Sequence, residues 1–333
     1  MTARRVGVYY AWSRPGESSA PLAVIEDRFP ALFESRRMLY PRLAELADPI
    51  QFDQNVAGFL DHILKKNFAA FIEQASAQTG QQALEAERVG DDGKMVPLSD
   101  ELAAALDTLI VISFDSLRTG QEATEAEVRA VRGFLAKPGN LLVVSPHHDI
   151  GHVEGIPAPD RQHRQETEFF HHGDKTIPPR QGFGGFGRSL LAGLGVPVRN
   201  RFGLRPAAEP DGSPTPIEVD RRLDRSKILD GVTTFNLHPH LPHFQRLDDA
   251  VLKMDVLARQ RIDPGAPPHP AFTQGGRFDA LLQSRTGVFA GDVLVCDATL
   301  WSSTAGGVDS LRRFWTNLVR RPHGDRPLLG ATS

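Results

Sequence analysis

Histidine and aspartate are concentrated in one short stretch of the chain, Ser145–His152 (SPHHDIGH). Neutral imidazoles and a carboxylate within a few residues are suitable ligands for a borderline divalent ion such as Zn²⁺, Mn²⁺ or Fe²⁺. The stretch follows Leu141–Val144 (LLVV), an apolar run typical of a strand buried on both faces. Ligand sites in open α/β sheets gather at the carboxyl ends of the strands. The pattern therefore predicts a metal or catalytic site at that edge of a sheet.

Two further histidine clusters lie downstream, HHGDK at 171–175 and HPHLPH at 238–243. The second cluster follows GVTTFNL (231–237), which has the composition of a strand. In an extended segment His238 and His240 point to the same side, so the pair could supply two ligands to one metal. If the strand before this pair neighbours the strand before SPHHDIGH, the clusters meet at one sheet edge.

We therefore expect one shared site. A metal ion there would lower the pKa of a bound water toward neutrality and make it a nucleophile. The histidines could also act without a metal, because an imidazole pKa of about 6.5 suits proton transfer at neutral pH. The expected metal ligands are His147, His148, Asp149, His238 and His240, and the expected general acids or bases are His172, Asp174, Glu166 and His243.

Three residues are expected to contact substrate. Tyr10 lies near the end of the first predicted strand, where it could line a pocket or belong to the core. Lys175 and Arg180 could attract a carboxylate. The run Gly182–Gly187 (GFGGFG) precedes a helix, and its amides could hold an anion. It lacks the Lys-Ser/Thr of a phosphate loop and follows no clear strand, so no nucleotide cofactor is expected.

The composition excludes several classes of protein. The 333 residues include 41 acidic and 38 basic side chains, a net charge of −3 that leaves no basic excess for nucleic acid. No apolar run reaches the ~18 residues that span a bilayer, and the first residues lack a signal-type apolar stretch. We expect a cytoplasmic protein without nucleic-acid or membrane partners. It would act on a small-molecule substrate and could form homo-oligomers.

The elements that must position these residues alternate between strands and helices. Thr124 and Glu127 form a predicted capping box that opens a helix, and this helix separates two apolar strands. A strand, helix and strand within about 35 residues is a βαβ unit, which implies a parallel sheet. Asp115 and Arg118 follow the first of these two strands, where we expect a solvated loop. The expected strands are 6–12, 109–114, 141–144, 231–237 and 292–297, and the expected helices are 31–47, 55–77, 124–136, 186–194 and 308–319.

The remaining segments are expected to be irregular. Gly80–Pro97 is polar and indicates a surface excursion, and Gly151–Gly182 and Asp263–Gly276 are rich in proline and glycine. A loop as long as 151–182 within a domain is usually functional or disordered. We expect a single α/β domain over residues 1–333, with a helical insertion at about 30–100 and a His-rich loop at about 145–182.

Several segments together resemble the class I glutamine amidotransferase-like proteins, a flavodoxin-like superfamily that includes the ThuA-like domains. They are LDTLIVISFDSL at 106–117, TEAEVRAVRGFLAKPGNLLVVSP at 124–146, SLLAGLGVPV at 189–198, GDVLVCDATLW at 291–301 and RRFWTNLV at 312–319. The resemblance covers residues 5–12 and 105–320. It implies a three-layer sandwich with a mostly parallel central sheet, here with long loop insertions. Fold does not by itself imply function.

The chain departs from that family at the nucleophile. An amidotransferase of this class needs a cysteine in a glycine-flanked elbow, whereas Cys296, the only cysteine, lies within the predicted strand LVCDA. We therefore expect a buried, inert thiol and no glutamine amidotransfer. The P-H-x-D pattern at 146–149 is also similar to the zinc-dependent N-deacetylases. Ile150 and Gly151 stand where their second carboxylate would be, so that family is not assigned.

The function expected from these residues is hydrolysis of an amide or ester bond in a small polar substrate, at a His/Asp-rich and metal-binding site. Two alternatives remain open. One is a metal-free His-Asp hydrolase or lyase on the same residues. The other is a non-catalytic ThuA-like domain that binds a small molecule or a sugar.

Overall fold

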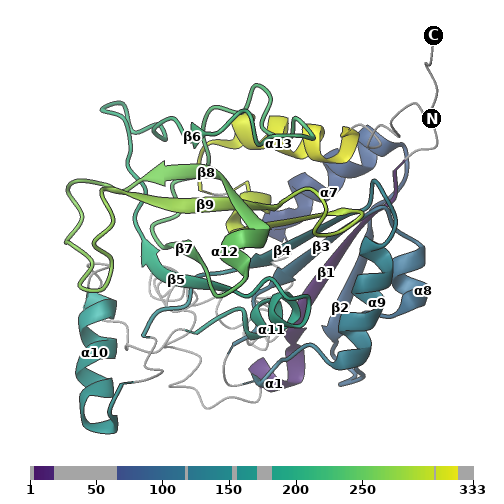
Figure 1. Ribbon diagram of the computed structural model, residues 1–333, viewed down its shortest axis with the longest axis horizontal. Helices are drawn as coiled ribbons and strands as arrows, with labels where there is room; N and C mark the ends of the chain where they lie inside the picture. The colour runs from purple at the N-terminus through teal and green to yellow at the C-terminus, as the bar shows by residue number, and fades with distance from the viewer. Residues whose placement is uncertain are drawn as a thin grey trace, which may run out of the picture.

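A mixed sheet of eight strands forms the centre of the described structure, which is a computed structural model covering residues 4–18, 66–116, 119–151, 156–170, 182–303 and 305–321 (Figure 1). The strand order is β2-β1-β3-β4-β10-β9-β8-β6. The first five strands are parallel, and β9, β8 and β6 extend the sheet in antiparallel fashion. The bounds are β1 Val6–Ser13, β2 Leu84–Val89, β3 Thr108–Ser113, β4 Leu141–Pro146, β6 Glu218–Val219, β8 Met254–Arg261, β9 Arg277–Ser284 and β10 Asp292–Cys296.

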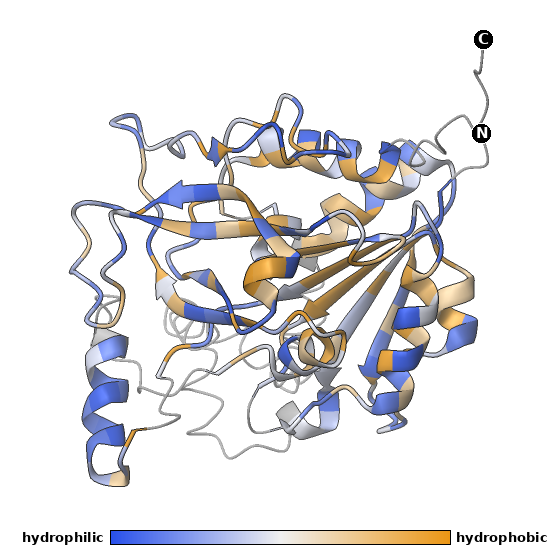
Figure 2. Ribbon diagram, viewed as in Figure 1, coloured by the Kyte–Doolittle hydropathy of each residue, from blue (hydrophilic) through white to orange (hydrophobic). Residues whose placement is uncertain are grey.

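Helices cover both faces of the parallel part of the sheet. Successive strand residues point to opposite faces, so Val8 and Tyr10 pack with α7 and α13, whereas Tyr9 and Ala11 pack with α9 and α11. Figure 2 shows the apolar central strands enclosed between these layers. None of the helices in the described ranges is long and apolar enough to cross a bilayer. The helix bounds are α1 Arg14–Ser18, α7 Lys66–Thr79, α8 Asp100–Ala104, α9 Glu125–Leu135, α10 Ala158–Phe170, α11 Gly185–Gly193, α12 Ala250–Lys253 and α13 Val308–Arg320.

Several predicted elements are confirmed. The strands expected at 6–12, 109–114, 141–144 and 292–297 are β1, β3, β4 and β10, and the closing helix is α13. The capping box of α9 forms as predicted: the Thr124 hydroxyl accepts from the Glu127 amide, and the Glu127 carboxylate accepts from the Thr124 amide. A mostly parallel α/β sheet is therefore shown.

The polar segment Gly80–Pro97 is not only a surface excursion, and the prediction is wrong for β2. This strand pairs in parallel with β1 at the edge of the sheet. Its acidic residues are bound by side chains of β1: Glu85 accepts from the Tyr10 hydroxyl at 2.7 Å, and Glu87 accepts from Trp12 Nε1 at 2.9 Å. The acidic residues of this edge strand are thus held by specific side chains of β1, although Glu85 is also exposed to water.

The predicted strand at 231–237 does not form, although Val232 and Phe235 are buried. Its backbone groups bond to loops and side chains instead of a neighbouring strand. The Thr233 amide donates to Ser310 Oγ at 3.0 Å, and the Leu237 amide donates to the Ala305 carbonyl at 2.7 Å. Burial of the run therefore did not require a sheet ladder.

Other expectations about regular structure also change. Helix α10 lies within 151–182, which was expected to be a loop, and β8 and β9 were not predicted. Strand β7, Leu241–Arg246, begins within the 238–243 cluster. It pairs antiparallel with β5, Val198–Leu204. The expected helix at 31–47 and the first part of the one at 55–77 lie outside the described residues.

A buried ion pair fastens the edge strand β2 to helix α9. Arg88 donates to the Glu127 carboxylate, and their side chains are only 4% and 1% exposed. The Arg88 guanidinium also lies 4.5 Å from the centre of the Phe186 ring on α11. Burial alone would raise the pKa of Glu127, but the hydrogen bond from Arg88 and those from backbone amides lower it overall. Glu127 is therefore ionised in the folded protein at neutral pH.

We predict that Glu127→Gln lowers the free energy of unfolding by about 3 kcal/mol at pH 7, because it leaves the buried Arg88 charge without its carboxylate. The lowered pKa of Glu127 means that its contribution is present above the ordinary value of 4.5 and is lost as the pH falls through the folded value. Urea denaturation should therefore show that the difference in the free energy of unfolding between Glu127→Gln and the unsubstituted protein becomes smaller in acid.

The matched control is Glu125→Gln on the same helix. Glu125 is 98% exposed and pairs with Arg129 only at 4.0 Å, so its loss should change little. Equal effects of the two substitutions at pH 7 would contradict the role assigned to the buried pair.

Candidate functional site

Four imidazoles from two distant segments meet beyond the carboxyl end of β4. His147 and His148 follow that strand directly, and His238 and His240 lie just before β7. The ring centres are 4.1 Å apart for His147 and His148, 4.9 Å for His147 and His238, and 5.3 Å for His148 and His240. The structure thus brings two of the three sequence clusters together. We call His147, His148, His238 and His240 the histidine cluster.

Parallel pairing places an aspartate against this cluster. β4 lies between β3 and β10, so the residues that follow these strands share one sheet edge. Asp297 follows β10, and its Oδ1 lies 3.0 Å from His147 Nδ1. Phe114 stacks on the face of the same ring with a centre-to-centre distance of 4.7 Å. His147 is therefore held by an aromatic ring on its face and a carboxylate at its Nδ1 edge.

Asp297 is an ionised partner despite its burial. Burial would raise the pKa of Asp297, but His147 and a hydrogen bond from the Thr299 hydroxyl lower it overall. The Thr299 amide also donates to the carboxylate at 2.8 Å. A carboxylate at Nδ1 favours the tautomer with the hydrogen on Nδ1, which leaves the Nε2 lone pair of His147 for a proton or a metal ion.

Asp297 was not among the site residues expected from the sequence. A signal was present, because an aspartate at the carboxyl end of the last predicted strand, DVLVCD, falls on the predicted sheet edge. Only the neighbouring position of β10 and β4 shows that it faces His147.

His238 is neutral at pH 7. Burial and, to a smaller extent, the nearby His147 lower its pKa to about 4, against an opposing effect of Asp297. Its Nδ1 accepts from the His240 amide at 3.3 Å, and its own amide donates to Asn236 Oδ1 at 3.2 Å. Neutral imidazole is the form that binds metals and accepts protons.

The donor types of the histidine cluster fit a borderline divalent ion, since neutral imidazoles suit zinc, iron and related metals. The orientation of the rings is a separate matter. In the described parts of the chain, no group of three or more His, Cys, Asp or Glu side chains is arranged to hold a metal ion. The chemistry of the donors therefore favours a metal, whereas their described arrangement would have to change to bind one.

Asp149, the fifth expected ligand, has a different partner. Its Oδ2 lies 3.4 Å from Arg188 Nη1 on α11. Burial raises the pKa of Asp149 to about 6, and the positive charges of Arg188, Arg199 and Arg201 oppose this rise. Asp149 is thus a partner of the arginines beside the histidine cluster.

The other expected site residues are dispersed. Tyr10 is fully buried and donates to Glu85 in the core. His243 lies in β7, where its Nδ1 accepts from the Asp279 amide at 3.1 Å and burial lowers its pKa. Glu166 is partly exposed on α10 and accepts from Gln162. His172, Asp174, Lys175 and Arg180 lie outside the described residues.

An amide of the glycine-rich run at 182–187 binds a carboxylate of the protein itself. Asp115, which was expected in a solvated loop, is fully buried and accepts from the Phe186 amide at 2.9 Å at the start of α11. The Gly187 amide donates to Ser113 Oγ at 2.8 Å. Residues after β3 therefore cap this helix, which removes the reason to expect an external anion there. Arg118 lies outside the described residues.

Cys296 is a buried core residue, as the sequence predicts. It is fully buried in β10, and burial raises the pKa of its thiol to about 12. Its sulfur lies 3.5 Å from Ser145 Oγ. A thiol in this environment is not an activated nucleophile.

Comparison with known proteins supplies no functional assignment, so the geometry of the site is the basis for one. No protein-family model matches the chain, and no curated protein matches it either.

Proposed function

We propose that the chain is a hydrolase that cleaves an amide or ester bond in a small polar substrate, with the histidine cluster as its active site. The contact between His147 and Asp297 carries the proposal, because a buried carboxylate fixes the tautomer and orientation of an imidazole among three others. A His-Asp pair of this kind positions a base or a metal ligand in many hydrolytic sites.

In the first form of the proposal, His147, His148, His238 and His240 hold a divalent ion, with Zn²⁺, Mn²⁺ or Fe²⁺ as the candidates. A bound ion would supply a water of lowered pKa. The protein's own contribution is to keep His238 neutral through burial and to orient His147 through Asp297. Asp149 is left out of the ligand set because its carboxylate faces Arg188.

The second form needs no metal. His147 would accept a proton from water or from a substrate hydroxyl at Nε2, while Asp297 stabilises the imidazolium that results. Hydrolysis and elimination are both open to such a pair.

We also propose that the fold is of the glutamine amidotransferase-like, flavodoxin-like class, with ThuA-like small-molecule or sugar binding as the non-catalytic alternative. The parallel strands β2-β1-β3-β4-β10 follow the 2-1-3-4-5 order of flavodoxin-like sheets, which supports this assignment. The buried Cys296 argues against amidotransfer itself.

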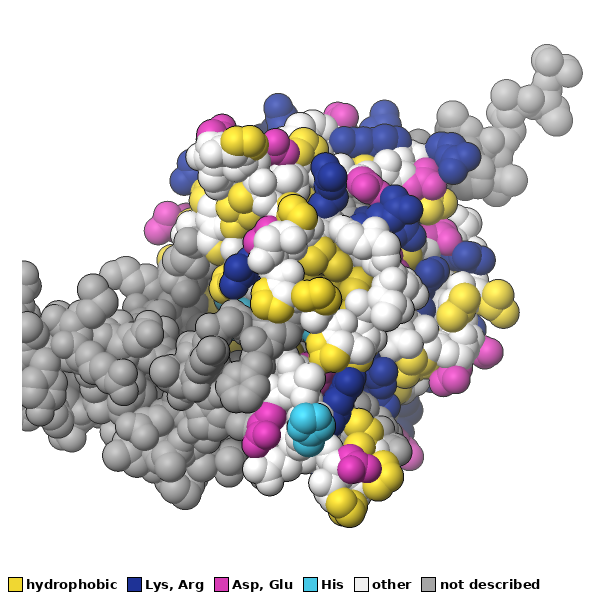
Figure 3. Space-filling model, turned by 90° about the vertical axis from the view of Figure 1, so that its left-hand side faces the viewer, with side chains coloured by type: hydrophobic (Ala, Val, Ile, Leu, Met, Phe, Trp, Pro, Cys, Tyr) yellow, Lys and Arg dark blue, Asp and Glu magenta, His cyan; other side chains and the backbone are white. Residues whose placement is uncertain are grey.

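The surface agrees with a small-molecule substrate. On the face shown in Figure 3, basic and acidic side chains are interspersed over the described part, and no large area of one charge is seen. Such a surface offers little attraction to a polyanion. We propose a cytoplasmic enzyme without nucleic-acid or membrane partners.

Metal analysis of protein purified without a polyhistidine tag tests the first form. We expect about one equivalent of zinc, manganese or iron, falling to near zero in His147→Ala and His240→Ala. His163→Ala on the exposed part of α10 is the matched control and should keep the metal. Less than about 0.1 equivalent in the unsubstituted protein, with no activation on adding these metals, would rule out the metal form.

The role of Asp297 can be tested by Asp297→Asn. If a metal is bound, its affinity should fall about 10- to 100-fold, because His147 loses the carboxylate that orients it. If no metal is bound, turnover of a chromogenic ester or amide should fall by a similar factor or more, with KM little changed. Full turnover in both Asp297→Asn and His147→Ala, in an enzyme that hydrolyses the substrate, would show that the active site lies elsewhere.

A further inference from the structure

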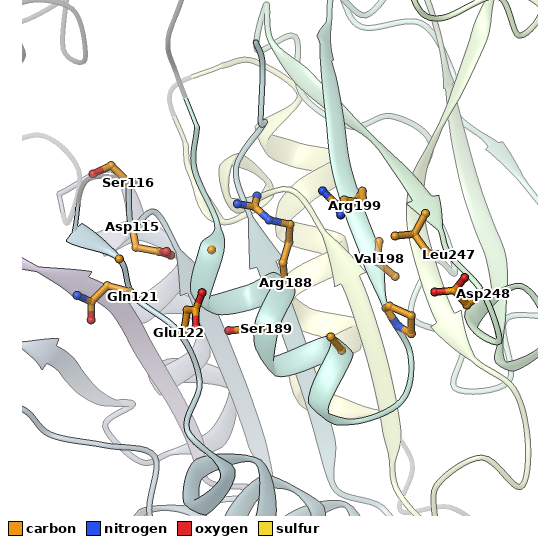
Figure 4. Close-up of a pocket in the computed structure, with 14 residues that line it drawn as sticks. Asp115, Ser116, Gln121, Glu122, Arg188, Ser189, Val198, Arg199, Leu247 and Asp248 are labelled. Atoms are coloured by element: carbon orange, nitrogen blue, oxygen red, sulfur yellow. The ribbon is translucent and has the colours of Figure 1, made fainter. Parts of the chain in front are cut away.

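A separate pocket of about 520 Å³ lies between α11 and β5 (Figure 4). Its size is within the range of about 300–1,000 Å³ that is typical of small-molecule sites. One wall is apolar and is formed by Ala192, Pro197, Val198 and Leu247. Two arginines, Arg188 and Arg199, extend into the same pocket, as Figure 4 shows. The pocket thus combines an apolar wall with fixed positive charge.

Arg188 is held rigidly through one of its nitrogens. Its Nη1 donates to the Phe183 carbonyl at 2.6 Å and to Asn200 Oδ1 at 2.8 Å, and it lies 3.4 Å from Asp149 Oδ2. These contacts leave the Nε–Nη2 edge of the guanidinium without a hydrogen-bond partner among the described residues. Nη2 lies beside Gly185, which also lines the pocket. A guanidinium edge held in place suits two parallel hydrogen bonds to a carboxylate.

The local charge also favours an anion. The positive charges of Arg188, Arg199 and Arg201 each lower the pKa of Asp149, which follows His147 and His148 in the chain. The other nearby carboxylate of the pocket wall, Asp115, is committed to Ser113 and to the start of α11. Glu122 and Asp248 stand at the rim and are exposed, so solvent and salt screen their charges.

The pocket is coupled to the active site by a short chain of contacts. Arg188 binds Asn200, and the Asn200 amide group donates to the main-chain carbonyl of His147. The amide of Asp149 donates to the Asn200 carbonyl at 2.7 Å. A ligand that bound Arg188 would therefore act on residues that hold the loop carrying His147 and His148.

We propose that this pocket binds a small organic carboxylate, with its carboxylate on the Nε–Nη2 edge of Arg188 and beside Arg199, and with its carbon chain on the apolar wall. The site is distinct from the histidine cluster and does not depend on the reaction proposed for it.

Isothermal titration with succinate tests the proposal, and succinamide serves as the neutral analogue of the same size. We expect saturable binding of succinate with a Kd of about 1 mM or below, and none of succinamide in the same range. Inorganic phosphate is the third probe. Binding of phosphate as tight as that of succinate would overturn the carboxylate assignment, and so would equal binding of succinamide or no binding of succinate up to about 10 mM.

Substitutions locate the site. Arg188→Lys keeps the charge but removes the planar edge, and Arg199→Gln removes a charge without touching the three contacts of Arg188. Each should weaken succinate binding about tenfold or more. The control is Arg222→Gln, at a side chain 90% exposed elsewhere on the surface, which should bind as the unsubstituted protein does. Circular dichroism establishes that each variant is folded.

His240→Ala separates this proposal from the function proposed above. This variant should lose its bound metal or its hydrolytic turnover. It should keep succinate binding, because His240 does not line the pocket. Unchanged binding in the folded Arg199→Gln and Arg188→Lys variants would place succinate elsewhere and overturn the inference.

Discussion

The candidate site depends on the parallel pairing of β4 with β3 on one side and β10 on the other. Because the three strands run the same way, the residues that follow them leave the sheet at one edge. Asp115, His147 and Asp297 come from three separate parts of the sequence and reach that edge together. Asp115 then caps α11, whereas Asp297 orients His147.

Burial at this edge determines the charge state of each group. His238 loses affinity for protons because it is enclosed, so it remains neutral. Asp297 is enclosed as well, yet it stays ionised because His147 and Thr299 stabilise the carboxylate. The ionised Asp297 carboxylate lies at hydrogen-bond distance from His147, and such an imidazole–carboxylate pair is a usual component of proton transfer and of metal binding. The arginines around Asp149 add positive charge to the neighbouring pocket.

The prediction of the fold succeeded where burial and periodicity coincide. The central strands are continuous apolar runs, and α9 carries its own capping signal in Thr124 and Glu127. The prediction failed where contacts between distant segments, and not the local sequence pattern, determine the structure. β2 looked polar because Glu85 and Glu87 bind side chains of β1, and 231–237 looked like a strand although its amides bond to loops. Asp115 looked solvated because its partners on α11 lie about 70 residues away.

The sequence by itself determined which side chains carry the chemistry, since the type and spacing of His147, His148, His238 and His240 are local properties. It also determined that the thiol of Cys296 would be buried within a strand. Only the tertiary structure decided which of these groups meet. The 5.3 Å between the rings of His148 and His240 depends on where β7 pairs with β5, and no local pattern encodes it. The pairing of β10 with β4 brought Asp297 to His147, and Asp149 faces Arg188 on α11.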